Sequence, residues 1–294
     1  MAGRRVSTER NQHERGIVQD VALNPVEAQY TQGDLRDRIL EALVDAGKDP
    51  EHPALEDLAP FDQFHTLGVL ATTALADAAG LTEGDEVLDV GCGIGGPART
   101  LAISYGCRVT GIDITPELCE VAEDLNARVG LSDRITIRHG DALALPFEDG
   151  SFDVVWTQHV SMNIADKAAL YREFARVLRP GGRLAFFDII AGNDPPHFPV
   201  PWADDASISH LVAEDEVGRL LEEAGFQVTH WEDTTQAGAE FFEKLVEGPP
   251  ASSPLGPHLL IPNLPSKMRN LTQNLKQGRV RVLRGVSRLN YGGF

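Results

Sequence analysis

A short glycine-rich turn constrains the fold of this chain more than any other feature. Residues 86–90 form a short apolar run of the kind found in buried parallel strands. Four glycines follow at once, namely Gly91, Gly93, Gly95 and Gly96. A helical pattern then covers 96–105. Glycines permit a tight turn and let a ligand touch bare backbone, and the start of a helix offers free N–H groups. The stretch therefore predicts a strand, a ligand-binding turn and a helix.

The rest of the chain alternates strands with helices. The strands expected after the first cover 108–114, 135–138, 152–156, 183–190, 227–231 and 280–289. The helices expected after the glycine turn cover 96–105, 116–130, 166–178, 212–224, 237–246 and 267–277. Such alternation predicts an α/β fold with a parallel sheet and helices on both faces. Ligands of such sheets bind at the carboxyl ends of the strands.

Acidic and polar side chains recur at these strand ends. They are Asp89, Asp113, Asp141, Gln158 and His159. A carboxylate at the end of the second strand can accept both ribose hydroxyls of an adenosine. A carboxylate after the third strand can accept from an adenine amine, and Asp89 can accept from a ligand amine. This alignment is more specific than the glycine turn. It favours S-adenosylmethionine, which needs no phosphate-binding loop.

The first 80 residues show helical spacing without a strand pattern. Helices are expected over 30–44 and 61–80, and residues 1–20 are expected to be loosely attached. The chain therefore divides into an N-terminal helical lid at 1–80, a cofactor-binding domain at 81–294, and two inserts on the substrate side of that domain at 191–212 and 247–266. Long proline-rich connections of this kind are usually functional or mobile.

Composition narrows the range of partners. With 26 Lys and Arg against 44 Asp and Glu, the net charge of −18 argues against a nucleic-acid partner. No apolar stretch reaches the roughly 18 residues needed to span a membrane, so we expect no membrane partner. The three cysteines are an odd number without metal-binding spacing, which favours a cytoplasmic location and no metal. The protein is expected to be a monomer or a homodimer.

The charge is unevenly distributed along the chain. From Gly248 to Phe294 there is no Asp or Glu, whereas seven Lys and Arg residues occur. One interpretation is that this basic segment docks on the acidic remainder of the protein. The alternative is that it forms a site for an anionic substrate or a partner.

Five segments carry a resemblance to a known family. They read Val87-Leu88-Asp89-Val90-Gly91-Cys92-Gly93, Gly111-Ile112-Asp113, Gly140-Asp141-Ala142, Gly150-Ser151-Phe152-Asp153-Val154-Val155 and Arg176-Val177-Leu178-Arg179-Pro180-Gly181-Gly182. Because these five segments occur in this order, the chain resembles the class I S-adenosylmethionine-dependent methyltransferases over residues 85–232. The resemblance implies a Rossmann-like sheet of seven strands whose last strand, here 280–289, is antiparallel.

The resemblance also implies which residues contact the cofactor, S-adenosyl-L-methionine. From one end of the cofactor to the other, the expected contacts are Asp89, Gly91, Cys92, Gly93 and Gln158 at the methionine moiety, Asp113 and Ile114 at the ribose and adenine, and Asp141 and Ala142 at the adenine.

Within the family, the segment Asp62-Gln63-Phe64-His65 and the ending 267–289 are similar to those of small-molecule methyltransferases. These include enzymes of the sarcosine/dimethylglycine and phosphoethanolamine type. The implied activity is methyl transfer to an N or O atom of a small molecule by in-line displacement. N-methylation and O-methylation are equally compatible with the sequence.

One departure from the family pattern concerns the catalytic base. Many relatives carry a histidine pair where this chain has Met162 and Asn163. His159 is the nearby candidate for the base or for a group that orients the substrate. The alternative is that it packs behind Gln158. Candidate substrate contacts are His65, Met162, Asn163 and Trp202.

Two other functions remain open from the sequence. An NAD(P)-dependent oxidoreductase would explain the glycine turn and Asp113, but not Asp141 or the segments around the fourth and fifth strands. A protein that binds the cofactor without catalysis would also keep these motifs.

Overall fold

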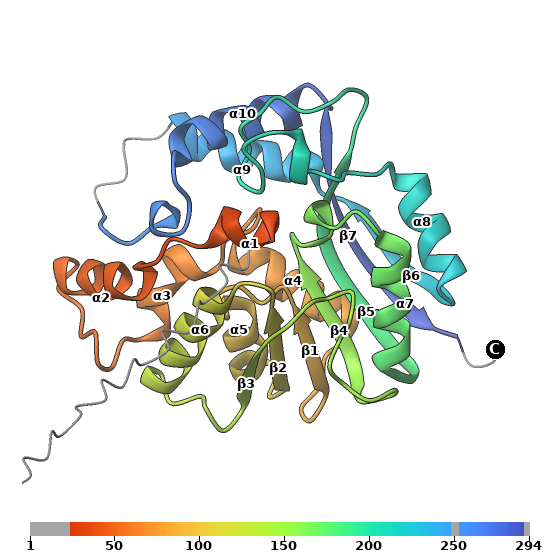
Figure 1. Ribbon diagram of the computed structural model, residues 1–294, viewed down its shortest axis with the longest axis horizontal. Helices are drawn as coiled ribbons and strands as arrows, with labels where there is room; N and C mark the ends of the chain where they lie inside the picture. Colours follow the sequence, from red (N-terminus) through yellow and green to blue (C-terminus); the bar gives the residue numbers. More distant parts are fainter. Residues whose placement is uncertain (1–23, 248–252, 291–294) are drawn as a thin grey trace, which may run out of the picture.

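The computed structural model describes residues 24–247 and 253–290. A seven-stranded sheet forms its centre (Figure 1). In spatial order the strands are β3 (Ile135–His139), β2 (Arg108–Asp113), β1 (Glu86–Val90), β4 (Phe152–Gln158), β5 (Leu178–Ala191), β7 (Val280–Leu289) and β6 (Phe226–Asp233). The first five are parallel, and β7 is antiparallel to both of its neighbours. The expected sheet with its antiparallel last strand is confirmed.

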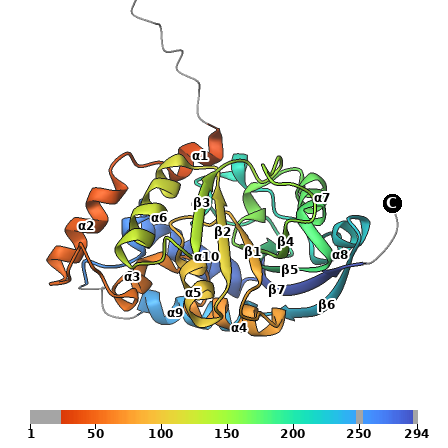
Figure 2. The same cartoon turned by 90° about the horizontal axis from the view of Figure 1, so that it is seen from below.

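Helices cover both faces of the sheet, as expected (Figure 2). One face packs against α4 (Val69–Ala79), α5 (Gly96–Ser104) and α6 (Pro116–Arg128), and the other against α7 (Lys167–Val177) and α8 (Glu214–Glu223). Consecutive residues of β1 point to opposite faces of the sheet. Val87 packs in the apolar cluster on the face of α4, α5 and α6, and Leu88 packs in the cluster on the face of α7 and α8. Because both faces are buried, β1 is apolar without alternation, which made it recognisable in the sequence.

The glycine turn joins β1 to α5 as predicted. Gly91 and Gly93 have φ values of 70° and 53°, which favour glycine. A Cβ at Gly91 would lie 2.3 Å from Val160 Cγ2, so a larger residue would also clash with the segment after β4. The turn therefore needs glycine both for its backbone conformation and for its close packing.

A roof lies beyond the edge where the parallel strands end (Figure 1). It consists of α9 (Thr235–Glu247), α10 (Leu264–Lys276) and the connection 192–213, which contains the short helix η2 (Ala206–Ile208). Asn270 Nδ2 donates to Pro199 O at 2.9 Å, and Asn274 Nδ2 donates to His197 O at 2.9 Å. These bonds tie the predicted insert 191–212 to α10.

The basic C-terminal segment docks on the acidic part of the chain. Arg281, on β7, pairs with Glu214 of α8 and with Asp233 at the end of β6. Arg284 pairs with Glu232. These contacts confirm the first of the two interpretations of the uneven charge.

The N-terminal segment differs from the expected single helix over 30–44. It forms α1 (Pro25–Tyr30) and α2 (Leu35–Asp45), with a break between them. At this break the carboxylate of Glu117, on α6, accepts from the backbone N–H groups of Gln32, Gly33 and Leu35. The break depends on a contact distant in sequence, so local helical spacing could not reveal it.

The expected helix over 61–80 is also divided. α3 (Leu55–Asp62) ends in close contact with the first residue of α5. A Cβ added to Gly96 would lie only 1.9 Å from Asp62 O. Residues 63–68 form an irregular link to α4, in which Leu67 and Gly68 have φ values of 67° and 54°. This link brings His65 into the cavity wall at the carboxyl edge of the sheet instead of placing it on a continuous helix.

Other expected elements differ mainly at their ends. β5 begins at Leu178 and not at 183, because Leu178 pairs with Phe152. Residues 1–20, expected to be loosely attached, lie outside the described residues, as do 248–252 of the second insert. Over 24–247 and 253–290, no helix has both the length and the apolarity needed to cross a membrane.

Candidate active site

A cavity of about 550 Å³ lies between the carboxyl ends of the strands and the roof. This volume is in the range of small-molecule sites. Its wall contains the predicted residues Gly91, Cys92, Gly93, Asp113, Ile114, Asp141, Ala142, Gln158, His159, His65, Met162, Asn163 and Trp202. Asp89 is not part of this wall and is buried in β1. The structure thus gathers the predicted cofactor and acceptor residues around one space.

Asp113, at the end of β2, braces the glycine turn. Its Oδ2 accepts from Gly93 N at 2.9 Å, and its Oδ1 accepts from Thr115 N at 2.9 Å. Each carboxylate oxygen retains a lone pair for a further donor. Burial raises the pKa of Asp113, and the two backbone N–H donors oppose that rise. A Cβ placed on Gly93 would meet nothing within 4 Å, so the backbone there is open to a ligand.

Asp89 lies behind this turn. It is 2% exposed, and its Oδ2 has no hydrogen-bond partner among the described residues. Burial, and secondarily the charge of Asp113, raises the pKa of Asp89 to about 8. The carboxyl group is therefore held protonated near neutral pH until a cation or a donor approaches it.

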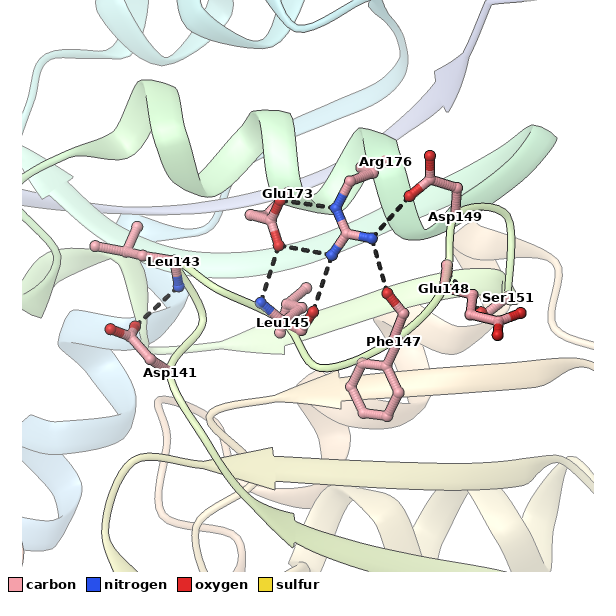
Figure 3. A network of polar contacts seen from close by, with 9 residues as sticks. All are labelled: Asp141, Leu143, Leu145, Phe147, Glu148, Asp149, Ser151, Glu173 and Arg176. Carbon is pink, nitrogen blue, oxygen red and sulfur yellow. Dashed lines mark hydrogen bonds and ion pairs between the residues drawn. The ribbon is translucent and has the colours of Figure 1, made fainter.

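The loop after β3 is held in place by one arginine of α7, as Figure 3 shows. Arg176 donates to Leu145 O and Phe147 O at 2.9 and 2.8 Å. Glu173 accepts from Arg176 and from Leu145 N. Asp141 Oδ1 accepts from Leu143 N at 2.9 Å. The loop is thus fixed at both ends, with Asp141 and Ala142 at the cavity.

Gln158 ends β4 with its amide group oriented by neighbours. Its Oε1 accepts from Trp156 Nε1 at 3.0 Å and lies 3.1 Å from Thr72 Oγ1. Because an indole N–H can only donate, it fixes which end of the amide is the oxygen. The Nε2 of Gln158 is buried without a partner in the described structure. Gln158 therefore presents an unused donor where it lines the cavity.

His159 has an unusual backbone conformation and a buried ring. Its φ is 56°, its N–H donates to Phe187 O, and its ring stacks on Phe187 with centroids 5.3 Å apart. No described group hydrogen-bonds to its buried Nε2. Burial, and secondarily His65, holds the pKa of His159 well below its ordinary value. The imidazole is thus neutral, with an Nε2 available to a ligand.

His65 faces His159 from the link between α3 and α4, with ring centroids 6.2 Å apart. Its Nε2 lies 3.0 Å from Gly68 O and 3.0 Å from Thr72 Oγ1. Because a carbonyl only accepts, Nε2 carries the proton. Burial lowers the pKa of His65 to about 4, so Nδ1 keeps its lone pair at neutral pH. The two imidazoles are a feature that the sequence did not indicate as a pair.

The segment after β4 is fixed by a buried acid and a buried lysine. Asp188 Oδ1 accepts from Val160 N at 2.8 Å and from Ser161 N at 3.3 Å. Lys167 Nζ donates to Ser161 O and to Ile164 O at 2.9 Å each, and also to a third carbonyl. Both side chains form hydrogen bonds to backbone groups of this segment. They therefore fix the position of the cavity wall.

Asn163 joins three parts of the cavity wall. Its Nδ2 donates to Trp202 O at 2.9 Å and to Ile208 O at 2.8 Å. Its Oδ1 accepts from Tyr30 OH at 3.1 Å. Trp202 is 1% exposed, and its Nε1 donates to Ser209 Oγ at 3.0 Å. The polar atoms of these side chains therefore pair within the protein.

Sequence reasoning missed a buried ion pair beside the site. Arg99 NH2 lies 3.0 Å from Asp62 Oδ2, and Arg99 also donates to Asn126 and to the carbonyl of Ile94. Asp62 Oδ1 is buried without a partner in the part of the chain described, and Asp62 lines the cavity. The only sequence signal for Asp62 was its position beside Gln63 and His65, in the segment that resembles small-molecule methyltransferases. Across 24–247 and 253–290, no group of three or more His, Cys, Asp or Glu could hold a metal ion.

Comparisons with known proteins agree with this geometry. The family model described as "Methyltransferase domain" matches residues 88–186. The chain is 37% identical over 195 residues to 27-O-demethylrifamycin SV methyltransferase of Amycolatopsis mediterranei, covering 60% of this chain and 71% of that protein. It is 40% identical over 134 residues to methyltransferase GfsG of Streptomyces halstedii, covering 46% of this chain and about half (48%) of that protein.

A solved structure shows the same fold. Phosphoethanolamine N-methyltransferase 2 of Haemonchus contortus, in complex with S-adenosyl-L-methionine, superposes with a TM-score of 0.68. The identity is 18%, and the match covers 92% of this chain and 61% of the other. At this identity the likeness concerns the fold alone.

Proposed function

The chain belongs to the S-adenosylmethionine-dependent methyltransferases, and from this premise we propose that it methylates an oxygen or nitrogen atom of a small molecule with His159 as the base. The observation that carries the proposal is the buried Nε2 of His159, which has no partner in the described structure and belongs to a residue that lines the cavity. A binding protein without catalysis would not need an unpaired buried imidazole nitrogen, since such a group costs stability. The relatives above give no support to an oxidoreductase.

The residues around the cavity fit the cofactor. Both the ammonium and the sulfonium of S-adenosylmethionine are cations, and the charged residues of the cavity wall are all acidic, namely Asp62, Asp113, Asp141 and Asp166. Asp89 Oδ2 and Gln158 Nε2 add a buried acceptor and a buried donor without partners in the described chain. The zwitterionic amino acid end of the cofactor would supply partners for both groups, its ammonium for the carboxyl and its carboxylate for the amide.

The proposed contacts follow the order of the strands. The methionine end would meet Asp89, Gly91, Cys92, Gly93 and Gln158, the ribose Asp113 and Ile114, and the adenine Asp141 and Ala142. The order is consistent with the carboxyl ends of β1 to β4, which lie side by side. The loop fixed by Arg176 keeps the adenine end rigid in this arrangement.

The mechanism assigns the protein three tasks. When bound, S-adenosylmethionine supplies an electrophilic methyl group. The cavity excludes water and holds the acceptor atom in line with that group. As the acceptor oxygen bonds to the methyl carbon, it becomes strongly acidic and its proton passes to His159 Nε2. A base with a depressed pKa suffices for this step because the proton is lost from a cationic oxygen.

The N-terminal segment 1–80 is proposed to act as a lid. Tyr30 lines the cavity, and Glu117 binds the backbone before α2, so the described part of this segment, residues 24–80, closes one side of the site. Within the domain 81–294, the inserts 191–212 and 247–266 would form the acceptor side. Met162 and Trp202 would contact the acceptor through their apolar surfaces, whereas the polar atoms of Asn163 act on the protein itself.

The cellular setting remains part of the proposal. The three cysteines are free and buried, which agrees with a reducing, cytoplasmic environment. The acidic net charge supports a small-molecule partner over a nucleic acid. A monomer or a homodimer is compatible with these observations.

The first test is calorimetric titration with S-adenosylmethionine and S-adenosylhomocysteine, followed by methyl transfer to a panel of phenols and amines. His159→Asn is the variant to compare, because asparagine tolerates the left-handed backbone at this position. We expect kcat to fall about 10²-fold or more with unchanged affinity for S-adenosylhomocysteine. Unchanged kcat would remove His159 from the mechanism, and lack of cofactor binding by folded protein would overturn the proposed function.

A further inference from the structure

The cavity wall is uneven in charge. Its described residues include no Lys or Arg, and its four carboxylates belong to the side where the cofactor is proposed to bind or to the loop beside it. The opposite side is formed by α9, α10, η3 (Pro257–Leu259) with the residues after it, and the insert around Trp202. We call this side the acceptor half. It is lined mainly by apolar side chains, namely Ile189, Pro201, Trp202, Ile208, Phe242, Leu260, Ile261, Met268 and Leu271.

Two large polar side chains at the acceptor half, those of Trp202 and Asn163, are engaged elsewhere. Trp202 Nε1 donates to Ser209 Oγ, and Asn163 uses its amide on two carbonyls and the Tyr30 hydroxyl. Lys267, which precedes the lining residue Met268, is 2% exposed and pairs with Asp204 at 2.8 Å. Its ammonium is therefore committed to a surface carboxylate.

These observations restrict the charge of the acceptor. A phosphate or carboxylate in the acceptor half would be buried without a described cationic side chain to pair with it, and near the acidic cofactor side. An ammonium group would likewise find no carboxylate among the residues by which α9, α10 and the insert line the cavity. Burying an unpaired charge is strongly unfavourable, whereas burying apolar surface is favourable.

One end of the acceptor half is different. His65 and His159 face each other there, with His65 Nδ1 and His159 Nε2 free of partners assigned in the described structure. Thr72 and Gly68 hold the proton of His65 on Nε2, so Nδ1 is an acceptor. A hydroxyl has one proton to donate, so the hydroxyl of an apolar molecule would donate to His159 Nε2 with the ring of His65 beside it.

We propose that the acceptor half binds a neutral, apolar molecule through its hydrocarbon or aromatic body and places one hydroxyl at the end where His65 and His159 lie, with His159 Nε2 accepting its proton. This inference rests on the proposed function for the identity of the reacting group, and it narrows that function to O-methylation. The bond balance is simple: the hydroxyl oxygen gains the methyl group, the sulfonium sulfur keeps the electron pair of the broken S–C bond, and the proton goes to His159.

The test uses three probes with the same ring system and different charges. They are 1-naphthol, which is neutral, 1-naphthyl phosphate, which is anionic, and 1-naphthylmethylamine, which is cationic. Binding of each is measured by calorimetry to the full chain saturated with S-adenosylhomocysteine. We expect 1-naphthol to bind at least about tenfold more tightly than either charged probe. Equal or tighter binding of a charged probe, or no binding of 1-naphthol, would overturn the proposal.

Substitutions of Met268 locate the binding. Met268→Arg places a cation in the acceptor half, and Met268→Leu is the matched control of similar volume. We expect the arginine variant to lose 1-naphthol affinity and to gain affinity for 1-naphthyl phosphate, each about tenfold, while the leucine variant changes little. Unaltered probe affinities in the arginine variant would place the probes elsewhere and contradict the proposal.

Two readouts keep this inference separate from the proposed function. Affinity for S-adenosylhomocysteine and the melting temperature report a folded cofactor half in each variant. If the arginine variant does not fold, the three probes on the unmodified chain decide alone. Failure of cofactor binding overturns the proposed function, whereas a preference for a charged probe with intact cofactor binding overturns only the acceptor class.

Discussion

The two halves of the cavity differ in how their polar groups are satisfied. On the cofactor side, Asp62 Oδ1, Asp89 Oδ2 and Gln158 Nε2 are buried without partners in the described structure. In the acceptor half, the side-chain amide of Asn163 and the indole N–H of Trp202 already have partners within the protein. One half is prepared to form hydrogen bonds with a ligand, whereas in the other these two side chains have completed theirs and only the His65–His159 end keeps an unpaired ring nitrogen.

This difference separates two kinds of recognition. Unpaired buried polar groups cost free energy in the free protein and regain it when a matching ligand binds, which gives chemical specificity. An apolar wall with satisfied polar groups recognises shape and apolar area instead. Substitutions on the cofactor side should therefore change cofactor affinity strongly, and those in the acceptor half should change stability or acceptor binding while sparing the cofactor.

The largest effect is expected where the N-terminal segment meets the cofactor half. Arg99→Met leaves the buried carboxylate of Asp62 without its cation, and breaking such a pair costs about 3–5 kcal/mol. Denaturant unfolding should show this loss in the free energy of unfolding. The double variant Asp62→Leu with Arg99→Met should recover most of it, because no unpaired charge remains. Equal stability of the single and double variants would show that the pair is not what holds this junction.

The next largest effect is expected on the cofactor side of the cavity. Asp113→Ala removes the carboxylate proposed to accept the ribose hydroxyls. Hydrogen bonds to a charged group contribute about 1.5–3 kcal/mol each, so affinity for S-adenosylhomocysteine should fall about 100-fold or more. Calorimetry measures the affinity, and the melting temperature controls for the lost support of Gly93 and Thr115. A folded variant with unchanged affinity would refute this contact.

A smaller effect tests the acceptor half. Asn163→Leu leaves two carbonyl groups and the Tyr30 hydroxyl without their partner, at a cost of about 2–3 kcal/mol in the free energy of unfolding. The hydrogen bonds of Asn163 do not involve residues proposed to bind the cofactor. We therefore expect the affinity of this variant for S-adenosylhomocysteine to change less than about threefold. A loss of cofactor affinity comparable to that of Asp113→Ala would show that the acceptor half and the cofactor side are not independent.

The same division explains what the sequence could predict. The cofactor half depends on short motifs, in which a strand, its glycine turn and the carboxylate at the next strand end occur close together in the chain. The sequence therefore predicts Asp89, Gly93 and Asp113 as cofactor contacts, and the structure places Gly93 and Asp113 in the cavity wall. The sheet of seven strands and the antiparallel β7 followed from the family resemblance that these motifs carry.

The acceptor half depends on contacts between distant segments. His65 reaches His159 only because the expected helix 61–80 is divided at Gly68, and Asn163 binds an insert about 40 residues later. Neither contact has a local signature. Asn163 was predicted to touch substrate, whereas the structure shows its polar atoms occupied by Tyr30, Trp202 and Ile208.

The smallest effect concerns pH on the cofactor side. Burial, and secondarily Asp113, raises the pKa of Asp89 to about 8, so the free protein holds this carboxyl protonated at pH 6. A nearby cofactor ammonium favours the carboxylate, so binding releases a proton. For release of one whole proton, affinity should then rise about 50-fold between pH 6 and pH 8 and level off above that.

Calorimetry in two buffers of different ionisation enthalpy measures the released proton directly. Asp89→Asn is the matched control, because the amide imitates the protonated carboxyl in shape and cannot titrate. It should abolish this part of the pH dependence while leaving affinity at pH 6 similar. A proton release that persists in the asparagine variant would assign the titration to another group and leave Asp89 as a purely structural support of the glycine turn.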